Sequence, residues 1–258
     1  MTASRTRRVA GPALGVLVFL AVLGLWEAWG RLEASYKVPA VSDVAGQAWE
    51  IWPSSEFLGE AGASLRRLAA GFAIGIALGI ALGLLIGSSQ RARRTLGPFL
   101  EFMRAIPVIA IVPAAIVVLG FGDASRIAVI AFGLCFPVLV ITAEGVRAIP
   151  PEVRDTASML HVGRVARLVH ITFPAALPSI MAGLRIAVSL GLVMVVVSEF
   201  VGETNGLGYW IRVQQELFLV PQMYAGVLFL GLLGYAFNRL FLVLERRVLA
   251  WHYGAAGE

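Results

Sequence analysis

The chain has 258 residues, of which 59% are hydrophobic and only 14% are charged. Ordinary soluble domains are about a quarter charged, so this composition excludes a soluble protein and indicates an integral membrane protein. The formal net charge of +5 is explained by Lys and Arg facing anionic lipid at the ends of membrane helices, and requires no nucleic acid partner.

The apolar segments predict an all-α polytopic membrane protein with six transmembrane helices. Each segment reaches or approaches the roughly 20 residues that a helix needs to cross about 30 Å of hydrocarbon. In chain order they are residues 9–30, 68–87, 98–120, 127–143, 178–201 and 222–244. We interpret the first as a retained helix, because its apolar run exceeds that of a secretory signal and no A-x-A cleavage site follows.

The positions of Lys and Arg predict the orientation. If the N-terminus is cytoplasmic, 15 of the 21 Lys and Arg residues lie at cytoplasmic ends and loops. The exceptions are Arg31, Lys37, Arg66, Arg67, Arg126 and Arg212. The positive-inside rule therefore predicts that both termini are cytoplasmic.

The first external loop, residues 31–67, contains a predicted short interfacial helix. Pro39, Ser42 and Asp43 precede alternating apolar residues, which is typical of a capped helix start. Trp49 and Trp52 suit the depth of lipid headgroups.

Glycines recur at every fourth position of the second predicted span: Gly71, Gly75, Gly79, Gly83 and Gly87. This spacing advances about 400° around a helix, so the glycines form one slowly drifting ridge. Such a ridge lets another backbone approach closely. It fits static packing inside the monomer, and it also fits a moving or dimerising interface.

The third span contains Pro107 and Pro113, with Glu101 and Arg104 just before the first proline. Proline kinks a membrane helix and is tolerated where protein or water satisfies the freed carbonyls. Glu101 and Arg104 are spaced to pair with each other. They suit a snorkelling pair at the cytoplasmic interface and equally a gating role.

Three further charges lie at predicted membrane depth, where an ionisable group is a functional candidate. Glu27 is close to its helix end, which favours interfacial placement. Arg185 is long enough to reach the cytoplasmic face, and Glu199 is a candidate to line the outer part of a pathway. The candidates for the translocation path or its gate are Glu101, Arg104, Arg185 and Glu199.

A charged segment, residues 152–178, separates the fourth and fifth spans. Pro150 and Pro151 suit a helix start. An apolar stripe recurs at helical spacing along Val153, Ala157, Leu160 and Leu168. The pattern predicts two short amphipathic helices, joined by a turn at residues 161–164 and ended by Pro174. The stripe fits the bilayer, the chain's own helices or a groove on a soluble partner.

The order of residues in this segment resembles the cytoplasmic signature of the permease subunits of binding-protein-dependent ABC importers. That signature is EAA, three residues, G, nine residues, I, any residue, LP. In this chain Asp155, Thr156 and Ala157 stand at the EAA positions and His161 stands at the G position. Ile171, Phe173 and Pro174 stand at the I, L and P positions. His161 replaces the glycine, so either Gly163 provides the turn or His161 is left-handed, which His tolerates better than most residues.

Three other stretches resemble the subgroup that imports nitrate, sulfonates and taurine. They read PFLEFMRAIPVIAIVPAAIVVLGFGDASR, SEFVGETNGLGYWI and LERRVLAWH. With the signature, the resemblance covers roughly residues 60–253.

The resemblance implies the type I importer fold and a multi-pass protein of the bacterial plasma (inner) membrane, forming a homodimeric or occasionally heterodimeric pore. It implies a cytoplasmic ABC ATPase dimer, which holds ATP and Mg²⁺, and an extracytoplasmic binding protein; the chain itself would bind no cofactor. Residues on or beside the ATPase-docking helix would be Asp155, Thr156, Ala157, Leu160, His161 and Gly163, and Pro174 would lead back into the membrane.

The predicted spans, together with the resemblance, divide the chain into three parts. Residues 1–67 would hold the cytoplasmic N-terminal tail, the first helix and a periplasmic loop. Residues 68–244 would form the transmembrane core with the coupling segment 144–177, and residues 245–258 a cytoplasmic tail.

The sequence contains no pattern for chemistry of its own. Lys37 is the sole lysine and lacks the glycines of a phosphate-binding G-x-x-x-x-G-K-[ST] loop, and the three histidines and Cys135 are not spaced for a metal. We therefore expect neither catalytic nor metal-binding residues. The resemblance implies a permease for a small anionic or sulfonate-like solute. The alternative is an ion-coupled secondary transporter without an ATPase, which the lack of an internal repeat disfavours.

Overall fold

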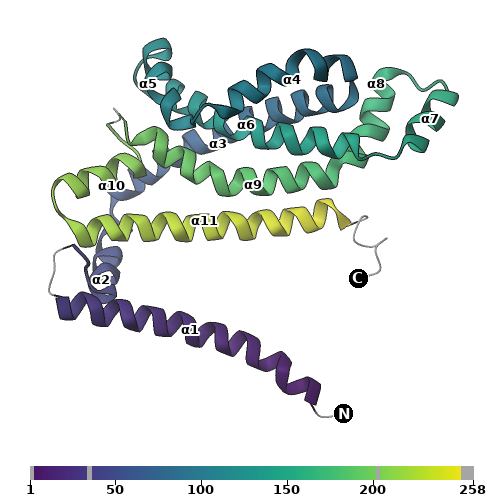
Figure 1. Ribbon diagram of the computed structural model, residues 1–258. Helices are drawn as coiled ribbons and strands as arrows, with labels where there is room; N and C mark the ends of the chain where they lie inside the picture. Colours follow the sequence, from purple (N-terminus) through teal and green to yellow (C-terminus); the bar gives the residue numbers. More distant parts are fainter. Residues whose placement is uncertain (1–2, 34–36, 202–203, 251–258) are drawn as a thin grey trace. The chain divides into compact units, whose positions relative to one another are not determined.

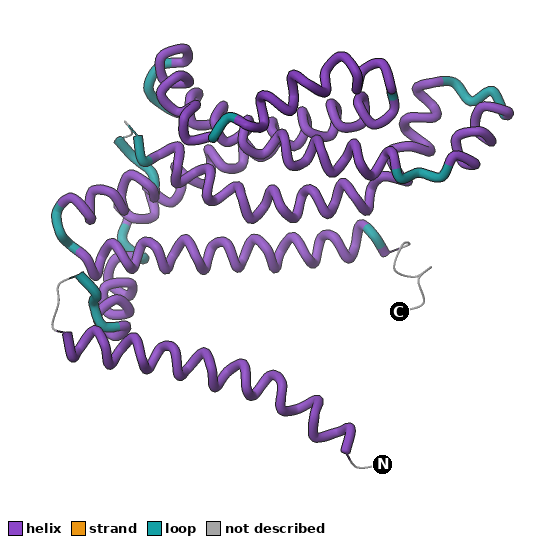
Figure 2. The backbone as a smooth tube through the Cα atoms, viewed as in Figure 1, coloured by secondary structure: helices purple, strands orange, loops and turns teal. Residues whose placement is uncertain are grey.

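The computed structural model describes residues 3–33, 37–201 and 204–250, and within these residues it contains helices and no β-strand (Figures 1 and 2). The helices are α1 (Ala3–Glu33), α2 (Val41–Ile51), α3 (Ser55–Ser88), α4 (Gln90–Ala105), α5 (Val108–Leu119), α6 (Asp123–Arg147), α7 (Pro151–Met159), α8 (Arg164–Arg167), the π-helix η1 (Leu168–Thr172), α9 (Phe173–Glu199), α10 (Leu207–Glu216) and α11 (Val220–Val248). The predicted all-α fold is confirmed.

Five helices in the described part of the chain are long and apolar enough to cross a membrane. They are Leu14–Leu32, Ser55–Ser88, Asp123–Arg147, Arg164–Glu199 and Val220–Val248. Each overlaps one of the predicted spans, and each of the last four is longer than its prediction. Polar residues continue these helices beyond the apolar run, because helical hydrogen bonding does not stop where the hydrophobic pattern does.

The remaining predicted span is broken into two helices. α4 ends at Ala105 and α5 begins at Val108, and the two form an angle of 97°. Ile106 has an extended conformation (φ −74°, ψ 121°) because the ring of Pro107 disfavours the helical region for the residue before it. Pro107 therefore breaks the span rather than kinking it, whereas Pro113 is accommodated inside α5.

Residue contacts divide the chain into two compact units, residues 1–58 with 210–229 and residues 59–209 with 230–258. In the first unit, the backbone N–H of Ser42 donates to Glu27 Oε2 of α1 at 3.0 Å. The N-cap of α2 is Ala40, whose side chain has no acceptor, so Glu27 satisfies a donor that a Ser or Asp cap would otherwise serve. The predicted helix is present, and its cap comes from α1.

In the second unit, α6 packs against the glycine ridge of α3. A Cβ on Gly75, Gly79 or Gly83 would lie 2.7 Å from a backbone carbonyl oxygen of α6. Real Cβ atoms do not approach an oxygen this closely, so only glycine allows the two backbones to lie at this separation. The ridge is therefore filled by a helix of the same chain, which agrees with packing inside the monomer.

The segment before the fifth span does not end at Pro174. α8, η1 and α9 follow one another without a break, and together they make the apolar helical stretch Arg164–Glu199. The backbone N–H of Phe173 donates to the carbonyl of Leu168, five residues earlier. This single π turn lies directly before Pro174, which has no N–H to donate. The helix therefore continues at the position where the sequence predicts its end.

Candidate functional site

The first candidate region is α7 with the turn that follows it. The N–H of His161 donates to the carbonyl of Ser158 at 3.0 Å, and the N–H of Val162 donates to that of Ala157 at 3.0 Å. These two bonds are those of a Schellman motif, in which the residue after the helix cap adopts the left-handed conformation. That residue is His161, with φ +51°.

The structure thus decides between the two predicted turns. Gly163 has φ −58° and lies in an extended conformation before α8, so it does not provide the left-handed residue. His161 occupies both the sequence position and the backbone role that a glycine would have.

Most of the predicted docking residues are on the surface. Asp155, Thr156 and Leu160 are exposed, and so is His161, whereas Ala157 is only 2% exposed. Thr156 Oγ1 donates to the carbonyl of Glu152 at 2.8 Å and is occupied within the helix. The predicted apolar stripe therefore turns partly inward at Ala157.

A different set of apolar side chains faces outward around the turn. Met159 is 78% exposed, Leu160 71% and Val165 76%. We refer to these three residues as the α7 patch. Pro174, predicted to lead back into the membrane, is the second residue of α9.

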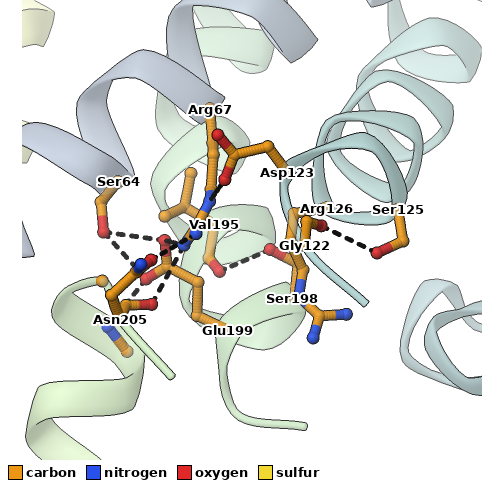
Figure 3. A network of polar contacts seen from close by, with 12 residues as sticks. Ser64, Arg67, Gly122, Asp123, Ser125, Arg126, Val195, Ser198, Glu199 and Asn205 are labelled. Carbon is orange, nitrogen blue, oxygen red and sulfur yellow. Dashed lines mark hydrogen bonds and ion pairs between the residues drawn. The ribbon is translucent and has the colours of Figure 1, made fainter. Parts of the chain in front are cut away.

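The second candidate region is a buried polar network around Glu199, the last residue of α9 (Figure 3). Glu199 is fully buried, with Ser64 Oγ 2.8 Å from both carboxylate oxygens. Arg67 Nη1 donates to Oε1 at 2.9 Å, and the N–H of Gly208 donates to Oε2 at 2.9 Å. A carboxylate at a helix C-terminus opposes the helix dipole, so these donors are what make its burial tolerable.

Arg67 connects this carboxylate to two further elements. Its Nε donates to Asp123 Oδ1 at 2.6 Å, at the start of α6. Its Nη1 also donates to the carbonyl of Asn205 at 3.0 Å, and its Nη2 donates to the side-chain oxygen of Asn205. Since Arg67 is 2% exposed, the network joins α3, α6, α9 and the turn 204–208, whose last two residues begin α10, inside the protein.

The turn itself is built for close approach to Glu199. Gly206 has φ +110°, a conformation that side chains rarely adopt, and its N–H donates to Glu60. A Cβ on Gly208 would lie 2.9 Å from the Cβ of Glu199. The N–H of Leu207 donates to Ser64 Oγ at 2.8 Å.

The sequence predicts Glu199 alone as a candidate in this network and places Arg67 in an external loop. The spacing of Glu60, Ser64 and Arg67, by four and three residues, places them on one face of a helix. This spacing is the sequence signal that could have indicated a polar cluster here. Glu199 as a pathway residue stays a prediction. In the structure, both oxygens of the Glu199 carboxylate accept hydrogen bonds from buried residues of the second compact unit.

Arg185 does not extend freely toward a membrane surface. Its guanidinium donates to Glu245 of α11, and Nε lies 3.1 Å from Glu245 Oε2. The carboxylate side chain is 7% exposed and that of Arg185 is 47% exposed. Arg185 therefore links α9 to the last turn of α11.

The third candidate region is a cavity of about 230 Å³ that contains Glu101 and Arg104. We refer to it as the α4–α6 cavity. Its charged lining residues are Arg93, Glu101 and Arg104 of α4 and Glu144 and Arg147 of α6. Within the described residues Glu101 and Arg104 form no ion pair with each other, contrary to the spacing-based prediction. Of the residues that line the cavity, Glu144 and Arg147 form an ion pair at 3.9 Å.

Among the described residues, no group of three or more His, Cys, Asp or Glu side chains is arranged to hold a metal ion. The polar groups of all three regions are suited to binding and to holding helices together.

Residues 75–250 match the family described as binding-protein-dependent transport system inner membrane component. The chain is 29% identical over 253 residues to SsuC of Bacillus subtilis, which is named for aliphatic sulfonate transport, with 97% of this chain and 92% of SsuC covered. It is 34% identical over 248 residues to RibX of Chloroflexus aurantiacus, the riboflavin transport system permease protein, with 95% and 92% covered.

A solved structure has the same fold. It is a chain of a bacterial alginate ABC transporter in complex with an alginate pentasaccharide-bound periplasmic protein. The TM-score is 0.66 at 13% sequence identity, and the match covers 95% of this chain and 96% of the other.

Proposed function

Because the chain belongs to the family of inner membrane components of binding-protein-dependent transport systems, and is thus the permease subunit of an ABC importer, we propose that it moves a small anionic or sulfonate-like solute into the cell. Transport proceeds by alternating access, with an inward-open and an outward-open state of the pore. The solute comes from an extracytoplasmic binding protein.

The energy enters through a cytoplasmic ABC ATPase dimer that docks at α7. The observation that carries this step is the α7 patch, since apolar side chains exposed beside a charged helix favour burial against another protein. ATP and Mg²⁺ are held by the ATPase, and this chain binds neither. Asp155, Thr156 and His161 lie on or beside the same surface.

Two copies of the chain form the pore, with the N- and C-termini in the cytoplasm. The excess of Lys and Arg on the side of α7 supports this orientation. A homodimer presents two equal α7 surfaces, one for each ATPase subunit, as closed twofold symmetry requires.

The solute class is supported by one relative and by the charges of this chain. SsuC is named for aliphatic sulfonates, whereas RibX is named for riboflavin. Sequence similarity alone therefore does not identify the transported solute. The three arginines of the α4–α6 cavity favour an anion.

The alternative, an ion-coupled transporter without an ATPase, is disfavoured because the chain belongs to a family of binding-protein-dependent transport components. The two proposals differ in one measurable property, the source of energy. An ABC importer needs ATP hydrolysis by its partner, and an ion-coupled transporter needs only a gradient.

Reconstitution into proteoliposomes tests the proposal. The chain is combined with its candidate ATPase and binding protein, and uptake of a radiolabelled alkanesulfonate is measured. We expect uptake that requires both partners and ATP, and that stops with a non-hydrolysable ATP analogue. Uptake by the permease alone, driven by a proton or sodium gradient, would contradict the proposal.

A further inference from the structure

The α4–α6 cavity is formed by one continuous face of each helix. Its lining residues on α4 begin at Arg93 and Gly97 and continue through Leu100 to Arg104, and those on α6 run from Phe136 to Arg147. These intervals of three and four residues keep each set on one helix face. α4 and α6 therefore form most of the lining, Ile86 of α3 adds to it, and Gly97 widens the cavity by having no side chain.

The cavity has an apolar floor and a charged rim. Leu100, Leu139 and Ala143 belong to one hydrophobic cluster with Ile86, and they supply the floor. The rim carries three arginines and two glutamates, which gives a net charge of +1. An amphiphilic lining of this kind suits a solute with one anionic end and an apolar end.

The rim charges are poorly compensated by their neighbours. Within the described part of the chain, the side chains of Arg93, Glu101 and Arg104 form no hydrogen bond or ion pair with another residue. Glu144 and Arg147 approach each other only to 3.9 Å. The guanidinium donors at the rim are therefore available to an acceptor from outside the chain, and guanidinium geometry suits oxyanions.

The volume limits the size of the solute. About 230 Å³ is nearly eight times the volume of roughly 30 Å³ that one water occupies in the liquid. The cavity therefore has room for about seven non-hydrogen atoms. A short alkanesulfonate or a short carboxylate is of this size.

We propose that the α4–α6 cavity is a binding site for a small organic monoanion with an apolar tail, held by Arg93, Arg104 and Arg147. Arg147 is the last residue of α6, directly before the loop to α7, and Arg154 Nη2 of α7 donates to the carbonyl of Val146 at 2.5 Å. In the proposed topology the site lies on the cytoplasmic side, next to the ATPase-docking helix. The inference rests on the proposed function, because it places the carried anion on this subunit before release.

Calorimetric titration of the full chain tests the site without the ATPase or the binding protein. The purified chain in nanodiscs of zwitterionic lipid is titrated with ethanesulfonate and, separately, with ethylammonium. We expect saturable binding of ethanesulfonate and none of ethylammonium. Arg104→Gln should weaken binding roughly tenfold or more, since hydrogen bonds to charged groups are worth this much, and Arg104→Lys should keep part of the affinity.

Two further variants separate the cavity from general charge attraction. Gly97→Leu leaves every charge in place and fills the cavity, so it should abolish binding. Arg94→Gln removes an exposed arginine that does not line the cavity, and it should leave the affinity unchanged.

The inference is overturned if the unmodified chain shows no saturable binding, if Gly97→Leu binds like the unmodified chain, or if Arg94→Gln weakens binding as much as Arg104→Gln. Its failure is distinguishable from failure of the importer proposal. ATP-dependent uptake without anion binding by the isolated chain contradicts only the cavity site. Anion binding without ATP-dependent uptake contradicts only the proposed function.

Discussion

The left-handed backbone of His161 carries a cost that a glycine would avoid. In this region the Cβ of an L-residue crowds the following carbonyl, which costs about 1–2 kcal/mol. His161 stays there because the two hydrogen bonds of the Schellman motif close the end of α7. The histidine therefore makes the turn less stable while its imidazole remains exposed beside the α7 patch.

We expect His161→Gly to stabilise the chain. Removing the Cβ relieves the backbone strain, and the greater chain entropy of glycine in the unfolded state offsets part of the gain, about 0.5–1 kcal/mol. The net effect should be a rise of about 1 kcal/mol in the free energy of unfolding, measured by denaturant titration in detergent. The same titration with His161→Val should show a loss, since β-branched residues tolerate this conformation least.

Replacement of Gly163 is the matched control for His161. Gly163 has φ −58°, and a Cβ there would meet no atom within 4 Å. Gly163→Ala should therefore change stability little. A loss from Gly163→Ala as large as that from His161→Val would show that the turn is not the one described.

At the scale of elements, the Glu199 network connects α3, the start of α6 and the end of α9 to one turn. Arg67→Met leaves the carboxylate of Glu199 buried without its cation, and the loss of one partner from a buried pair costs about 3–5 kcal/mol. We expect a corresponding fall in thermal stability in detergent. Arg67→Met combined with Glu199→Gln should recover much of that loss, because no buried charge is then unpaired.

Arg66 provides the control for this experiment. It precedes Arg67 on the same helix and is exposed, so Arg66→Met should change the melting temperature little. If Arg66→Met and Arg67→Met were equally destabilising, the buried ion pair would not be the source of the effect.

The elements also show what the sequence could and could not predict. The existence and type of each span followed from hydropathy, because helix length in a membrane is set by the thickness of hydrocarbon. The break at Pro107 and the continuation through Pro174 did not follow, since both prolines disturb a helix by the same local chemistry. In the structure the residue before Pro107 is extended, whereas a π turn precedes Pro174, and the two prolines alone do not predict this difference.

The candidate site was predictable only where a single segment carried it. The α7 turn lies within one stretch of chain, and the sequence narrowed it to His161 or Gly163. The Glu199 network draws partners from α3, α6 and the turn 204–208, and so Ser64, Arg67 and Asn205 could be recognised only in three dimensions. The glycine ridge was visible in the sequence, whereas its partner α6 was not.

At the scale of the whole molecule, transport requires that the permease hold its ATPase through an exposed surface. Leu160 is 71% exposed in the α7 patch, and its side chain is free to enter a groove. Leu160→Glu places a charge in that contact, so we expect the ATPase to be lost on co-purification and ATP-dependent uptake to fall at least tenfold, since burying an unpaired charge costs more than about 1.4 kcal/mol. The permease itself should insert and fold normally, because the Leu160 side chain is largely exposed and contributes little to the core.

Two comparisons make this outcome specific to docking. Leu160→Met keeps an apolar side chain of similar volume and should retain the ATPase. Ala157→Arg is not equivalent, because Ala157 is 2% exposed, and its replacement should lower the thermal stability of the permease as well as ATPase binding. If Leu160→Glu co-purified with the ATPase as well as Leu160→Met does, α7 would not be the docking surface, and energy would have to enter the permease elsewhere.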